Sequence, residues 1–91
     1  MNYDKNLAED IEKTLLNLAM TRGAGKTFCP SEAARAIGGS HPDGWGPLMT
    51  PVRHAAISLA DEGRIMIYRK GKPVDPHDFK GVYRIGLPYS D

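Results

Sequence analysis

Hydrophobic residues recur along the first part of this chain at the spacing of a helix that buries one face. Between residues 4 and 20 they are separated by four, four, three and one positions, at Leu7, Ile11, Leu15, Leu18 and Ala19. Asp4 is a suitable N-cap, and Arg22 followed by Gly23 is typical of a helix end. The pattern predicts a first helix over residues 4–20.

A second, shorter helix is predicted to begin at Pro30. Proline suits the first helical position, where its missing N–H costs nothing. Cys29 then takes the cap position, and Glu32 stands at the spacing of a capping box. The helix continues to Ile37 and ends at two glycines, which open the loop "GGSHPDG".

A third helix is predicted within residues 45–62, "WGPLMTPVRHAAISLADE". Its apolar residues project within roughly 60° of a common direction, and they are Trp45, Leu48, Met49, Val52, Ala55, Ala56 and Leu59. Pro51 leaves two starting points open. In the preferred one Thr50 is the cap, Pro51 is the first helical residue and Trp45 lies in a separate turn; in the other the helix begins at Pro47 and is kinked.

The remaining apolar residues indicate strands. Residues 64–69, "RIMIYR", alternate in character, and residues 82–87, "VYRIGL", form a second strand. The turn-rich stretch "KGKPVDPHDFKG" between them makes a hairpin with an elongated tip. Because a lone hairpin is marginal in water, residues 27–28 are expected to complete a three-stranded sheet.

The order helix, short strand, helix, helix, strand, loop, strand predicts an α+β winged helix. We expect one domain over residues 1–91, with loose tails at 1–4 and 88–91. The blocks "FCPSEAARAI", "WGPLMTPVRHAAISLADEGRI" and "YRKGKPVDPHDFKGVYRI" resemble an uncharacterised family of small bacterial winged-helix proteins, a domain of unknown function. The resemblance implies a fold and carries no established activity, since fold does not establish function.

Charge is unevenly distributed along the chain. The formal net charge is only +1, whereas residues 64–84 hold six basic and two acidic residues, a net of +4. A single cysteine fits a reducing compartment. Without an apolar run of about 18 residues or a signal pattern at the start, a cytoplasmic protein is expected.

Three motifs suggest a functional site, but the residues around each of them do not support it. The letters "GAGKT" lack the first glycine of a phosphate-binding loop, with Met20 in its place, and a helix precedes them where a strand is needed. Cys29 at a helix start is favoured as a weak cap over a redox or catalytic thiol. His41, His54 and His77 lack zinc-ligand spacing. We therefore expect no enzyme activity, no cofactor and no metal.

The favoured function is a nucleic-acid-binding module that contacts duplex DNA through the third helix and the basic hairpin. A regulatory role for this module is left open. Arg53 and His54 are the candidate base or phosphate contacts on the helix. The hairpin supplies candidate backbone contacts, namely Arg69, Lys70, Lys72 and Lys80. A solvated loop with no binding role explains these lysines equally well. The sequence leaves open whether Arg84 faces the sheet surface or Asp61 and Glu62.

The alternative function is a protein–protein interaction module with an unknown partner and no nucleic-acid role. Ile57, Val74 and Phe79 are candidates for an apolar docking patch. Packing of Phe79 into the core of its own domain is favoured over that patch, and Trp45 is expected to anchor the core beneath the loop before the third helix. The pattern does not indicate an oligomeric state.

Overall fold

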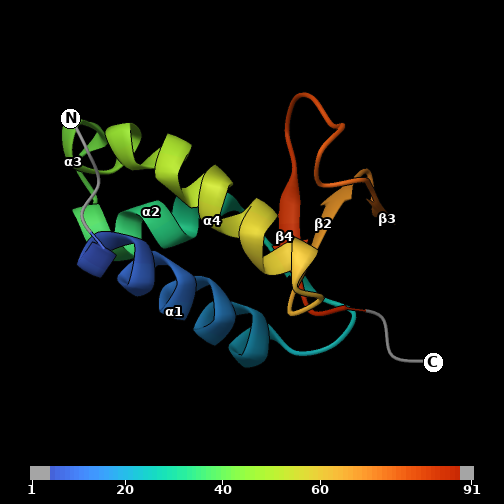
Figure 1. The fold of residues 1–91 in the computed structure, drawn as a ribbon. Helices are drawn as coiled ribbons and strands as arrows, with labels where there is room; N and C mark the ends of the chain where they lie inside the picture. The colour runs from blue at the N-terminus through green and yellow to red at the C-terminus, as the bar shows by residue number, and fades with distance from the viewer. Residues whose placement is uncertain (1–4, 89–91) are drawn as a thin grey trace.

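The computed structural model describes residues 5–88, with helices on one side and a small sheet on the other (Figure 1). The Asp4 cap and the expected tails at residues 1–4 and 88–91, apart from Pro88, lie outside these residues. Helix α1 runs over Lys5–Arg22. Ile11, Leu15 and Ala19 are fully buried, so the predicted helical face is confirmed. Gly23 ends the helix with φ +87° and donates its N–H to the Ala19 carbonyl at 3.0 Å.

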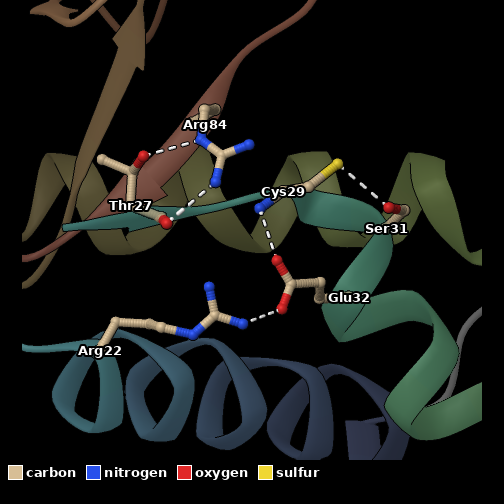
Figure 2. A network of polar contacts seen from close by, with 6 residues as sticks. All are labelled: Arg22, Thr27, Cys29, Ser31, Glu32 and Arg84. Atoms are coloured by element: carbon tan, nitrogen blue, oxygen red, sulfur yellow. Dashed lines mark hydrogen bonds and ion pairs between the residues drawn. The ribbon is translucent and has the colours of Figure 1, made fainter.

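The short strand β1 covers Thr27–Phe28. Helix α2, Pro30–Gly38, follows it in sequence and starts at the predicted proline. A carboxylate oxygen of Glu32 accepts a hydrogen bond from the backbone N–H of Cys29 at 3.1 Å. The other carboxylate oxygen pairs with Arg22 at the end of α1, as Figure 2 shows. Glu32 therefore caps its own helix and ties α1 to α2 at the same time.

The loop between the second and third predicted helices contains helical structure of its own. Helix α3 covers Pro42–Trp45 and a 3-10 turn, η1, covers Gly46–Leu48. Carbonyl oxygens of Gly38 and Gly44 lie where a Cβ on the other residue would have to stand, so neither position has room for a side chain. This close approach folds the loop back onto α2.

Helix α4, Met49–Asp61, is the predicted third helix. The separate turn at Trp45 is confirmed, but the helix starts at Met49, two residues before the preferred position, and Leu48 rather than Thr50 is the cap. Pro51 lies in the first turn, where the N–H groups have no intrahelical partner, and therefore needs no kink.

Four strands form an antiparallel sheet in the order β1-β4-β2-β3. The sequence predicted three of these strands and missed the fourth, β3. Strand β2 is Met66–Arg69, β3 is Lys72–Pro73 and β4 is Arg84–Gly86. Lys70 at φ +53° and Gly71 at φ +81° form a tight turn between β2 and β3. The elongated tip is thus a short hairpin, followed by a loop over residues 74–83 that rises away from the sheet in Figure 1.

The helices and one sheet face enclose a single cluster of buried side chains among the described residues. Ile85 and Ile67 are paired neighbours on the inner face of the sheet, with Phe28 beside them. Phe79, from the 74–83 loop, is only 8% exposed, so its predicted packing into the core is confirmed. Trp45 is half-buried against this core under the guanidinium of Arg35.

Candidate nucleic-acid interface

The wing, defined here as residues 66–83, carries three of the predicted contacts at its surface. Lys70, Lys72 and Lys80 are all exposed, and within residues 5–88 none of them forms an ion pair. Lys70 lies in the tight turn, and Lys72 follows it as the first residue of β3. Two lysines on the short hairpin and one on the loop that follows it give the wing a positively charged surface that an anionic polymer can approach.

Arg69 has a supporting contact inside the wing. It is half-buried, and its Nε donates a hydrogen bond to the Val82 carbonyl at 3.0 Å. This bond joins β2 to the end of the loop that carries Lys80. The loop position is therefore coupled to the hairpin, and part of the guanidinium of Arg69 is occupied.

Arg53 is directed toward the wing from α4. Its guanidinium lies 4.0 Å from the ring centroid of Phe79 and 5.7 Å from that of Tyr83, and it donates a hydrogen bond to the Phe79 carbonyl at 3.2 Å. A cation over aromatic faces with one hydrogen bond is a favourable intramolecular site. Arg53 therefore holds the wing loop against α4.

His54 lies on a different flank of α4. It is exposed and lines a shallow pocket of about 190 Å³ with Ala8 and Glu12 of α1 and with Pro51, Ala55 and Ser58 of its own helix. Arg53 and His54, adjacent in sequence, thus face the wing and α1 respectively. The structure brings Arg53 to the wing residues and leaves His54 apart from them.

Two further exposed cations, Lys26 and Arg84, were not among the candidate contacts, and the orientation of Arg84 was left open. Arg84 faces the outer surface of the sheet, where its Nε donates to Thr27 Oγ1 at 2.7 Å and its Nη2 donates to the Thr27 carbonyl at 3.0 Å. The signal for this orientation was alternation along β4, because the buried Ile85 requires Arg84 to face outward. Lys26 stands in the glycine turn before β1 and gave no comparable signal.

The other candidate groups have ordinary structural surroundings. Cys29 is half-buried with its Sγ 3.0 Å from Ser31 Oγ. His77 Nε2 lies 2.8 Å from an Asp61 carboxylate oxygen and links the wing loop to the end of α4. In the part of the chain that the structure describes, no cluster of His, Cys, Asp and Glu is arranged to hold a metal, and no helix there has the length and hydropathy of a membrane span.

Burial of Tyr83 leaves its hydroxyl without a hydrogen-bond partner in the described structure. The ring is in edge contact with Phe79, at 5.2 Å between centroids. Loss of hydration raises the pKa of Tyr83 to about 12, although the positive charge of Arg53 acts in the opposite direction. The aromatic base of the wing is therefore a tightly packed, poorly hydrated region.

Three main helices followed by an antiparallel sheet with a projecting wing place the protein in the winged-helix class. The chain belongs to the family described as "Protein of unknown function (DUF3253)", whose model matches residues 8–88. This match agrees with the family resemblance of the sequence blocks. No match is found among curated proteins.

Proposed function

We propose that this domain binds duplex DNA through the sugar-phosphate backbone, with the wing as its main contact. The observation that supports the proposal is the set of exposed lysines at Lys70, Lys72 and Lys80, which have no ion-pair partner within residues 5–88. Unpaired lysines can neutralise phosphates and release counterions without first losing an internal partner.

The same contacts suggest that sequence preference is weak. Arg53 has partners within the domain, and the remaining exposed side chains of α4 include Thr50, His54 and Asp61. Of these, Asp61 repels phosphate. Base-edge recognition by arginine, asparagine or glutamine has little support on this helix, so we assign Arg53 and Arg69 to positioning the wing and its three lysines to backbone contacts.

A fluorescence-anisotropy titration with two unrelated labelled duplexes, each at low and at moderate salt, tests the proposal. We expect similar affinities for the two sequences and a steep loss of affinity with salt, because phosphate contacts dominate. Absence of binding at low salt would overturn the proposal.

A charge variant shows whether the wing is responsible. Lys70→Asn, Lys72→Gln and Lys80→Gln are combined, since asparagine tolerates the positive φ of position 70. The control combines Lys13→Gln on α1 with Arg64→Gln, which removes two positive charges from exposed positions outside the wing. We expect the wing variant to lose at least about tenfold in affinity and the control to lose much less. Equal losses would contradict the role of the wing.

A further inference from the structure

The outer face of the sheet, opposite the core, contains a pocket of about 200 Å³. It is formed by the turn before β1, the β2–β3 turn, and residues of β2 and β4. Its cationic residues come from three separate segments: Lys26, Lys70 and Arg84. Among the described residues no carboxylate lines this pocket, and these three cations form no ion pair within residues 5–88.

Arg84 is held in place before any ligand arrives. Two of its nitrogens donate to Thr27, to Oγ1 at 2.7 Å and to the backbone carbonyl at 3.0 Å. The remaining nitrogen points away from Thr27 in Figure 2. A fixed guanidinium loses little side-chain entropy when it binds an anion, so it is a better ligand than a free surface arginine.

The base of the pocket is rigid and aromatic. Tyr68 is 6% exposed, and its hydroxyl donates to the Leu87 carbonyl at 2.7 Å. A Cβ on Gly86 would stand 2.9 Å from the Lys26 carbonyl and 3.3 Å from Tyr68 Cε2. The absence of a side chain at Gly86 therefore lets the Lys26 turn and the Tyr68 ring lie close together on this face.

We propose that this pocket binds a phosphate group. Its volume is below the roughly 300–1,000 Å³ that drug-sized ligands occupy, which favours a small polar group. Cations that line one pocket from three segments match a compact tetrahedral anion, and the arginine fork adds directed hydrogen bonds. Lys26 is the lysine of "GAGKT". It lines the pocket from a turn that precedes strand β1, so the proposed site is not a nucleotide-binding loop.

The phosphate group has two possible sources, a free phosphate or monoester and an internal phosphodiester of a nucleic acid. The inference does not depend on DNA binding by the wing, although Lys70 belongs to both sites. Lys72 and Lys80 do not line the pocket, so the two sites can be tested separately.

The test is a titration of the folded protein with inorganic phosphate at constant ionic strength, followed by amide NMR spectra. We expect saturable shifts concentrated at residues 25–27, 70–71 and 84. Lys26→Gln, which removes the positive charge of an exposed side chain, should weaken this binding by roughly fivefold to tenfold, as should Arg84→Gln. Lys13→Gln, at an exposed position on α1 that does not line the pocket, is the control and should leave phosphate binding unchanged.

A parallel titration with a dinucleotide that has one phosphodiester and no terminal phosphate identifies the source. Tighter binding of the dinucleotide at the same amides assigns the pocket to a nucleic-acid backbone, and tighter binding of inorganic phosphate assigns it to a free phosphate or monoester. Shifts that fail to saturate, or that persist equally in the Lys26 and Arg84 variants, would overturn the proposal. Loss of DNA binding in the Lys72 and Lys80 variants with retained phosphate binding would separate this pocket from the wing.

Discussion

The guanidinium of Arg53 packs over Phe79, 4.0 Å from the ring centroid, and also bonds the Phe79 carbonyl. One side chain thereby fixes both the ring and the backbone of the wing loop. The contact joins residues 26 positions apart, which explains why the sequence indicated a surface arginine on the third helix. The partners of Arg53 lie on the wing loop, which folds back against α4 along a path that no local sequence pattern specifies.

Replacing Arg53 should therefore act on stability even in the absence of any ligand. Arg53→Met keeps much of the aliphatic stem but removes the cation and its hydrogen bond, and we expect a loss of about 1–2 kcal/mol. Urea unfolding measures it. Lys13→Met, at an exposed site with no ion pair in the described structure, is the control and should change stability by less than about 0.5 kcal/mol. Equal effects of the two substitutions would contradict a role for Arg53 in holding the wing loop against α4.

Tyr83 predicts a dependence of stability on alkaline pH. Burial raises its pKa from 10.0 to about 12, so between these values the unfolded chain has lost the phenolic proton while the folded chain keeps it. The folded state then binds more protons, and its stability falls as pH rises through this window. The loss attributable to Tyr83 is on the order of 2 kcal/mol.

The free energy of unfolding is measured for the wild type and for Tyr83→Phe at pH 9 and above. The difference between the two proteins isolates the effect of Tyr83 from that of the other groups that titrate there. The variant should be as stable as the wild type or more stable near neutral pH, because it removes a hydroxyl that has no partner in the described structure. It should also lose less stability between pH 10 and 12. Identical pH profiles for the two proteins would show that Tyr83 titrates normally.

Among the elements, those with strong local signals were predicted and those without were missed. Cys29, Pro30 and Glu32 specified the start of α2, because capping depends on neighbours within one turn. Strand β3 was missed since it has only two residues, one of them Pro73, and is defined by pairing with β2. Helix α3 was predicted only as a loop with a separate turn at Trp45, since Pro42, Asp43 and Gly44 are typical of turns.

The β2–β3 turn is the element on which the wing depends. Gly71 has φ +81° with open space around its Cβ position, so Gly71→Ala should cost about 1–2 kcal/mol through backbone strain alone. Gly46, at φ −54° and equally open, is the matched control. Gly46→Ala should be neutral or slightly stabilising by thermal unfolding. A harmless Gly71→Ala would show that the turn relaxes to another conformation.

At the scale of the molecule, the fold was predictable from the sequence and the arrangement of its cations was not. Three amphipathic helices and two apolar strands are local patterns, and they define a winged helix. The net charge of +1 conceals both the basic wing and the outer-sheet pocket. Lys26, Arg84 and Lys70 line one pocket because β4 pairs with β1 on one side and with β2 on the other. These are long-range contacts that spacing does not specify.

The salt dependence of duplex DNA binding tests the central claim most directly. The logarithm of the association constant of the wild type should fall linearly with the logarithm of salt concentration. Combined replacement of Lys70, Lys72 and Lys80 should reduce the magnitude of that slope by about 2–3 units, since each phosphate contact contributes about 0.9. An unchanged slope in the variant, or no measurable binding by the wild type at low salt, would contradict a wing that binds DNA through its lysines.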